Sequence, residues 1–166
     1  MWSGTSHGPV TEPRPGSGRR PIAKADSVAT DSPPPAPRYR EFFVLFNRAD
    51  YFDAHEVLEG LWHEVRPDGE DADFFKGLIQ VAGAFTHLKI HFENPAHPVH
   101  ARRLRPAARL FRSAAAYLAP CAPDHHGLDV DEAVALCRNH SEAIESSRFK
   151  RNPWSPRNSP KLELSR

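Results

Sequence analysis

The sequence has few cysteines and no long apolar run, and each absence excludes a class of protein. Its 166 residues include two cysteines, Cys121 and Cys137, which do not form a CxxC pair. This spacing favours neither a zinc knuckle nor a disulfide framework. No stretch approaches the roughly 20 apolar residues of a membrane span. The first residues also lack the apolar run of about 7–15 residues found in a secretory signal. We therefore expect a cytoplasmic protein with no membrane partner.

Neither positive nor negative charge is in clear excess, so there is no general reason to expect a nucleic-acid partner. The chain has 22 basic and 21 acidic residues, a net charge of +1. The local exception is "HARRLRPAARLFR", which we interpret as a solvated, arginine-rich helix start. Phosphate or nucleic-acid contact is the alternative, although no row of aromatic side chains accompanies the arginines. Those arginines are Arg102, Arg103, Arg105, Arg109 and Arg112.

Three regions follow from composition. Residues 1–37 are rich in proline and glycine and poor in large apolar residues. Such a segment cannot offset about 1–2 kcal/mol of backbone ordering per residue, so we expect a disordered extension. Residues 38–149 form the predicted folded domain, and residues 150–166 form a tail interrupted by prolines that we expect to drape over the domain.

The predicted domain is all-α, a compact bundle of about five helices, because no alternating strand pattern with hairpin turns is present. "RPDGEDAD" is predicted to be a turn, and Pro106 suits the first position of a helix. Asp129, with Glu132 three residues later, has the spacing of a capping box. The expected helices are a short one from Arg38, then Tyr51–Val65, a long one after Asp73 ending near Phe92, Pro106–Leu118, and one that begins after Asp129.

Two polar residues occupy the apolar face of the second predicted helix. At about 100° per residue, Tyr51, Leu58, Glu59 and Trp62 fall within about 60° of His55. His55 and Glu59 are therefore predicted at the centre of a face where leucines are usual.

The third predicted helix is apolar around most of its surface, which is typical of a central, buried helix. It has one polar stripe. Small residues line this stripe and leave space for a side chain of the facing helix. A short turn makes the two helices antiparallel neighbours, so this stripe is predicted to face His55 and Glu59. The stripe comprises Asp73, Lys76, Gln80, Gly83, Ala84, His87 and His91.

Three interpretations of this polar pocket remain open. The first is a satisfied structural network in which Glu59 accepts from His55, His87 or the Trp62 indole, and Gln80 bridges. The second is a divalent-metal site formed by His55, Glu59 and His87. The third is a small-ligand or catalytic pocket with His55 and Glu59 as an acid–base pair.

Ligand contacts in that pocket are assigned to Trp62, Gln80 and Lys76. "HEVLE" is not the zinc-protease signature, because Glu59 occupies the place of its second histidine. Apart from a possible divalent metal ion, no cofactor is indicated.

The remaining histidines and cysteines carry weaker hypotheses. His125 and His126 are expected in a solvated turn, with metal binding as the alternative. Cys137 is predicted to be a small core residue, and Cys121, beside two prolines, is expected to be exposed.

The same segments resemble the domain-of-unknown-function 309 family of small bacterial, archaeal and plastid helical proteins. The likeness covers about residues 38–135, through "LFNRADYFDAHEVLEGLWHEV", "DFFKGLIQVAGAFTHLK", "AARLFRSAAAYLAP" and "GLDVDEAV". The family pattern matches at Asn47, His55, Glu56, Glu59, Trp62, Lys76, Gly77, Gln80 and His87. The resemblance implies an all-α bundle and no established activity. The connector from Glu93 to Arg105 departs from the pattern, and residues 1–37 lie outside it.

Two functional hypotheses follow. One is a metal- or ligand-binding domain, with hydrolysis as the least specific reaction if it is an enzyme. The other is a non-enzymatic interaction or scaffold module, in which the polar cluster is structural and binding uses the arginine-rich connector or the N-terminal extension. Homo-oligomerisation is compatible with both.

Overall fold

The computed structural model describes residues 37–165. The predicted disordered extension, residues 1–37, lies outside this part except for Pro37, which begins α1. Five α-helices form the bundle, as predicted. They are α1 (Pro37–Asn47), α2 (Tyr51–Val65), α3 (Gly69–Glu93), α4 (Leu104–Leu118) and α5 (Val130–Ser146). Short 3-10 helices lie at His100–Arg102, Ala119–Cys121 and Pro156–Asn158. Among the described residues, no helix combines the length and apolar character needed to cross a membrane.

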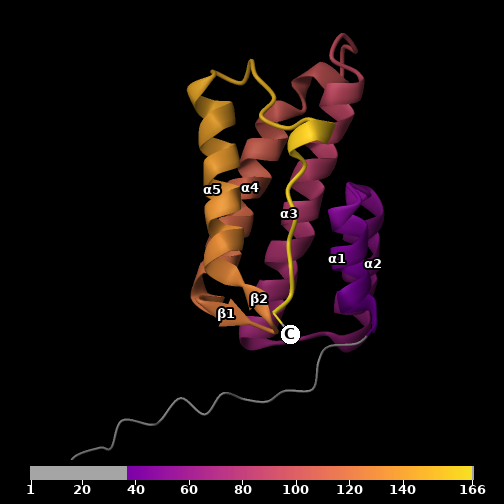
Figure 1. The fold of residues 1–166 in the computed structure, drawn as a ribbon, viewed down its shortest axis with the longest axis vertical. Coiled ribbons are helices and arrows are strands. Elements are labelled where there is room, and N and C mark those ends of the chain that lie inside the picture. The colour runs from indigo at the N-terminus through magenta and orange to yellow at the C-terminus, as the bar shows by residue number, and fades with distance from the viewer. Residues whose placement is uncertain (1–36, 166) are drawn as a thin grey trace, which may run out of the picture. The chain divides into compact units, whose positions relative to one another are not determined.

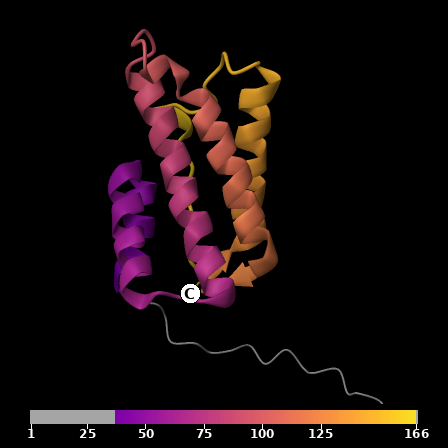
Figure 2. The same ribbon diagram turned by 180° about the vertical axis from the view of Figure 1, so that it is seen from behind.

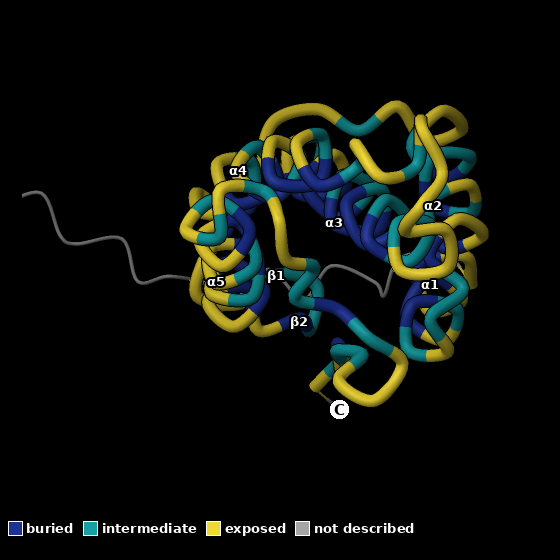
Figure 3. The backbone as a smooth tube through the Cα atoms, turned by 90° about the horizontal axis from the view of Figure 1, so that it is seen from above, coloured by how far each residue is buried: buried dark blue, intermediate teal, exposed yellow. Residues whose placement is uncertain are grey.

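The helices pack chiefly in chain order, with α3 at the centre. α2 packs on one side of α3 and α4 on the other, while α1 packs on α2 and α5 on α4. Figure 1 shows the final segment of the chain descending in front of α3, from the end of α5 towards the C-terminus. Seen from behind in Figure 2, α3 lies between α4 and the α1–α2 pair. The buried parts of the helices face the interior of this arrangement (Figure 3).

Two helices begin earlier than the sequence pattern predicted. α3 begins at Gly69, so the turn after α2 is only Arg66–Asp68. Its first turn contains Glu70 and Asp71, whose negative charges are favourable at a helix N-terminus. α4 begins at Leu104 rather than Pro106, and proline is tolerated there because the first-turn N–H groups need no helical partner.

The N-terminus of α5 matches the prediction. The Glu132 backbone N–H donates to Asp129 Oδ1 at 2.8 Å, which caps the helix.

A small β-hairpin between α4 and α5 was not predicted. Its strands, β1 (Asp124–His125) and β2 (Leu128–Asp129), pair antiparallel, with His125 opposite Leu128. The two-residue turn is His126–Gly127, with φ values of 49° and 77°. Positive φ at both positions is what a type I′ hairpin turn requires. Strands of two residues are too short to produce an alternating pattern, so the sequence could not show them.

Aromatic side chains link α1 to the centre of the bundle. The Phe46 ring lies 5.5 Å from that of Phe85 on α3, and both side chains are fully buried. α3 and α4 approach closely at Gly77, where an added Cβ would lie 2.6 Å from Leu118 Cγ. A side chain at position 77 would therefore require Leu118 to shift, so glycine suits the close packing here.

The tail is held against the bundle by specific contacts. The Asn47 side chain donates to the Leu162 carbonyl at 2.9 Å and accepts from the Leu162 N–H at 2.8 Å. The buried Trp154 indole donates to the Tyr51 hydroxyl at 3.0 Å. At the far end, the Ser165 N–H donates to the Gly127 carbonyl at 2.7 Å. The tail therefore connects the start of α2 to the hairpin.

Candidate functional site

His55 and Glu59 lie at the edge of the buried face of α2, so the prediction of a central position was wrong. Their side chains are 28% and 45% exposed. The centre of the buried face is formed by Ala54, Leu58 and Leu61, which are almost completely buried. His55 and Glu59 lie to one side of these residues. A small alanine contributes little to an apolar pattern, yet it packs closely against a neighbouring helix. The edge position leaves His55 and Glu59 accessible to solvent.

Gly83 marks the place where three helices meet. An added Cβ there would lie 3.7 Å from His55 Cδ2 on α2 and 3.6 Å from Leu110 Cδ1 on α4. The predicted approach of His55 to the polar stripe of α3 is therefore present. The polar stripe of α3 lies where α2 and α4 flank this helix (Figure 2), and we refer to this three-helix seam as the groove.

Three buried polar atoms at this groove have no hydrogen-bond partner among the described residues. They are His55 Nδ1, Trp62 Nε1 and Gln80 Oε1. We call His55, Glu59, Trp62 and Gln80 the groove cluster. The hydrogen bonds that the structural interpretation predicted, from His55 or the Trp62 indole to Glu59 and through Gln80, are not formed.

Two carboxylates lie beside His55. Its Nδ1 is 3.5 Å from Glu56 Oε1 and 3.9 Å from Glu59 Oε2. The three ligand-type atoms lie within 4.8 Å of one another, so they could hold a metal ion. For direct proton transfer, His55 and Glu59 would have to approach to about 2.6–3.2 Å.

His87 is not part of this group, although the sequence pattern placed it in the metal site. Its Nδ1 lies 3.0 Å from Arg103 Nη1. Because a guanidinium can only donate, Nδ1 must be the acceptor and the proton must be on Nε2. Burial, and then the charges of Arg103 and Arg109, lower the pKa of His87 below its ordinary value. His87 is therefore a neutral imidazole on the α4 side of the groove.

Lys76, predicted to contact a ligand, interacts with α4. Its Nζ lies 4.7 Å from the centre of the Tyr117 ring, a cation–π contact. Lys76 lies about one helical turn before Gln80, so it could reach a ligand only at the end of the groove nearest the start of α3.

The arginine-rich segment makes mainly internal contacts. Arg105 lies over the Phe149 ring at 4.2 Å, and Arg112 forms an ion pair with Glu145. Arg103 also donates to His100 Nδ1 at 2.9 Å. These contacts hold the segment to the rest of the protein and leave Arg102 and Arg109 exposed to solvent.

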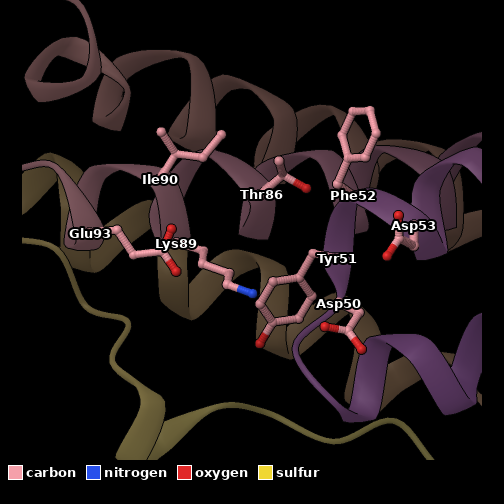
Figure 4. A pocket seen from close by; sticks show the side chains of 8 residues that line it. All are labelled: Asp50, Tyr51, Phe52, Asp53, Thr86, Lys89, Ile90 and Glu93. Carbon is pink, nitrogen blue, oxygen red and sulfur yellow. The ribbon is translucent and has the colours of Figure 1, made fainter.

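A hollow of about 220 Å³ lies further along the α2–α3 seam. Figure 4 shows residues from the start of α2 and the last turns of α3 surrounding it. Lys89 crosses it and donates to the Ala49 carbonyl at 3.0 Å. The lining residues are Asp50, Tyr51, Phe52, Asp53, Thr86, Lys89, Ile90 and Glu93. None of the predicted site residues is among them.

A second group of candidate ligands was predicted only in part, because the sequence suggested His125 and His126 but not Asp71. Asp71, in the first turn of α3, lies against His125 and His126 of the hairpin, and we call these three residues the hairpin cluster. The two Nε2 atoms lie 2.7 and 2.8 Å from Asp71 Oδ1. The imidazole side chains are only 19% and 15% exposed, so the predicted solvated turn was wrong. The adjacent histidines were the only signal in the sequence, and nothing there identified the carboxylate 54 residues away.

The two cysteines are buried and free. Cys137 is a core residue, as predicted. Cys121 is also buried, contrary to expectation, and its thiol donates to the Glu70 carbonyl at 3.6 Å. Burial, and then nearby carboxylates, raise the pKa of Cys121 to about 11, so the thiol is neutral at physiological pH.

Comparison with known proteins confirms the resemblance. Residues 39–97 match the family model described as Domain of unknown function (DUF309), a shorter stretch than the sequence likeness suggested. No curated protein and no solved structure matches the chain.

Proposed function

We propose that this chain, whose residues 39–97 match DUF309, binds a small polar molecule in the groove, where α3 lies between α2 and α4. The observation that carries the proposal is the set of three buried polar atoms, one each on His55, Trp62 and Gln80, that have no partner in the described part of the chain. A buried donor or acceptor left unpaired costs about 1–3 kcal/mol. Such a cost is expected at a binding site, where a ligand supplies the missing partners.

The chemistry of these atoms restricts the ligand. The Trp62 indole N–H can only donate, so the ligand must offer an acceptor. Gln80 Oε1 is an acceptor, so the ligand must also offer a donor. Glu56 and Glu59 at the rim favour a positively charged donor such as an amine. On the opposite side, Arg103 and Arg109 favour an anionic group. A small zwitterion, or an amine bearing a hydroxyl or carbonyl group, fits this arrangement.

A divalent metal ion is the second candidate, supported by the proximity of His55, Glu56 and Glu59. In this version Glu56 takes the place that the sequence pattern gave to His87. A metal ion alone would leave the Trp62 indole unpaired, and two rim carboxylates are well solvated. We therefore favour the organic ligand. Catalysis would be a further step in which His55 and Glu59 move together to exchange a proton.

The first test is a fluorescence titration, because the Trp62 indole is part of the groove cluster. The full-length protein is titrated with small amines, zwitterionic amino acids and simple carboxylates, and separately with Mn²⁺ and Zn²⁺. We expect amines or zwitterions to change the emission, and Trp62→Phe to abolish that change. Carboxylates without an amine should have no effect.

The matched variants are Glu59→Gln in the groove and Glu41→Gln on the exposed face of α1. A charged hydrogen bond contributes about 1.5–3 kcal/mol, so Glu59→Gln should weaken amine binding by about 10-fold or more. Glu41→Gln should have no effect. Equal affinities in the two variants would contradict the proposal. A response to metal ions alone, lost in Glu59→Gln and kept in Trp62→Phe, would support the metal alternative.

A further inference from the structure

The hairpin cluster has the composition of a transition-metal site. Two imidazole nitrogens and one carboxylate oxygen converge, and the ligand atoms all lie within 4.8 Å of one another. Two histidines and one carboxylate form a common ligand set for zinc, and for non-haem iron and other divalent transition metals. Imidazole gives the set its preference for these metals over Mg²⁺ or Ca²⁺, which favour oxygen ligands.

The present geometry needs only a small adjustment to accept a metal ion. The Nε2–Oδ1 separations of 2.7 and 2.8 Å are hydrogen-bond lengths. Ligand atoms about 2.0–2.2 Å from a tetrahedral zinc ion lie about 3.3 Å apart, so each separation must widen by about half an ångström. The Asp71 side chain is 45% exposed and can move outward by this amount.

The protonation change is equally simple. Both imidazoles now carry a proton on Nε2, since both donate to Asp71. To ligate a metal through Nε2, each imidazole must release this proton, and the ligand that results is the neutral tautomer with its proton on Nδ1. The carboxylate keeps its negative charge.

The surroundings hold the two imidazoles in place. The His125 ring centroid lies 4.6 Å from that of Phe74, and the His126 ring is stacked on Phe75 at 6.2 Å. The Tyr39 hydroxyl donates to the His126 carbonyl at 3.3 Å. These contacts restrict both rings and surround one side of the cluster with apolar groups, which strengthens metal–ligand attraction.

We propose that Asp71, His125 and His126 form a divalent transition-metal site with three protein ligands and an exchangeable fourth position. The site is separate from the groove cluster, and its two histidines lie beyond the residues that match DUF309. Because the fourth position is open, the bound metal would be available to an external ligand such as water or an anion.

The test uses untagged full-length protein, with Zn²⁺ titrated in competition with a chelator of known affinity. Wild type should bind one zinc ion at this site. Asp71→Ala and His125→Ala should each weaken binding by about 10-fold or more, since even loss of the groups that support ligands costs 10–100-fold. Co²⁺ is a second probe, because the intensity of its visible bands distinguishes four-coordinate from six-coordinate binding.

Two controls make the result specific. His97 and His100 form another stacked histidine pair, with ring centroids 4.2 Å apart, and within residues 37–165 no acidic residue completes a metal-binding group there. The double variant His97→Ala/His100→Ala should retain wild-type affinity. Glu59→Gln should also retain it, which separates this site from any metal bound in the groove.

Asp71→Asn addresses the case in which Asp71→Ala fails to fold. Its amide oxygen can still accept from both imidazoles, so the fold is kept while the anionic ligand is lost. Loss of zinc binding in folded Asp71→Asn supports the site. The proposal is overturned if wild type does not bind zinc, if Asp71→Asn and His125→Ala bind as tightly as wild type, or if the His97/His100 variant loses binding equally.

Discussion

At the groove cluster, three buried polar atoms lack partners within residues 37–165, whereas at the hairpin cluster both imidazole Nε2 atoms share one carboxylate oxygen. The first arrangement lowers stability unless something binds, and the second raises it in the absence of any ligand. Unpaired polar atoms are the basis of our proposal that the groove binds an external molecule. Converging paired atoms are the basis of our proposal that the hairpin cluster exchanges its hydrogen bonds for a metal ion.

The largest expected effect comes from breaking the tail, which contacts the start of α2 and the hairpin. Trp154 is 3% exposed, and it donates to Tyr51 at the start of α2. Trp154→Ala should lower the free energy of unfolding by about 3–5 kcal/mol, measured by urea denaturation. Phe52, an aromatic residue on the surface of α2, is 61% exposed, so Phe52→Ala provides the control and should change stability little. A similar loss in both variants would show that the tail is not an anchor.

The next effect tests whether the hairpin cluster is stabilising without a metal. Asp71→Ala removes the acceptor of two hydrogen bonds and should lower the free energy of unfolding by about 1–3 kcal/mol in chelator-treated protein. The partial exposure of Asp71 favours the lower end of this range. Asp73→Ala removes an exposed carboxylate from the same helix and should have little effect. No difference between the two variants would mean that the cluster contributes nothing to stability.

The same carboxylate predicts a pH dependence. Partial burial favours its neutral form, but hydrogen bonds and charges from His125 and His126 outweigh this and lower the pKa of Asp71. A carboxyl group whose pKa is lower in the folded protein stabilises the fold above its unfolded pKa, which is about 3.9. This stabilisation is lost as the pH falls through the folded pKa. Wild type should therefore lose more stability than Asp71→Asn between pH 5 and strongly acidic solution, by acid titration monitored with circular dichroism.

The smallest effect has the opposite sign and concerns the groove cluster. Gln80→Met keeps the shape of the side chain and removes an acceptor that has no partner. Stability should remain unchanged or rise by up to about 1 kcal/mol, because replacing an unpaired polar group by an apolar one removes a desolvation cost. Thermal unfolding of ligand-free protein measures this change. A clear loss of stability would show that Gln80 does have a structural partner.

The local features of this fold could be predicted from the sequence, whereas contacts between residues distant in the chain could not. The period of 3.6 residues located α2 with its correct ends, and the Asp129–Glu132 spacing located the start of α5. Periodicity also placed His55 beside the polar stripe of α3, because a short turn determines which helices are neighbours. The predicted position of His55 and Glu59 at the centre of the buried face of α2 was wrong because Ala54 was not counted as part of that face.

The hairpin cluster could not be predicted in the same way. Asp71 and His125 are brought together by the packing of α3, α4 and a two-residue strand, and no sequence period connects them. The partner of His87 was missed for a similar reason, since Arg103 belongs to a connector whose path is not periodic. Contacts of this kind depend on tertiary structure, and a single sequence carries no local signal for them.

The contact between Asn47 and Leu162 has a consequence for the integrity of the chain. One side-chain amide supplies both the donor and the acceptor that a neighbouring strand would offer to a backbone. The last segment is thus bound in the manner of a recognised peptide, through its main chain at Leu162 and through the Trp154 side chain in a buried site. A protein cleaved in the exposed stretch around Arg151 should therefore keep this segment as a non-covalent fragment, and a truncated bundle should recover its stability when the segment is added in trans.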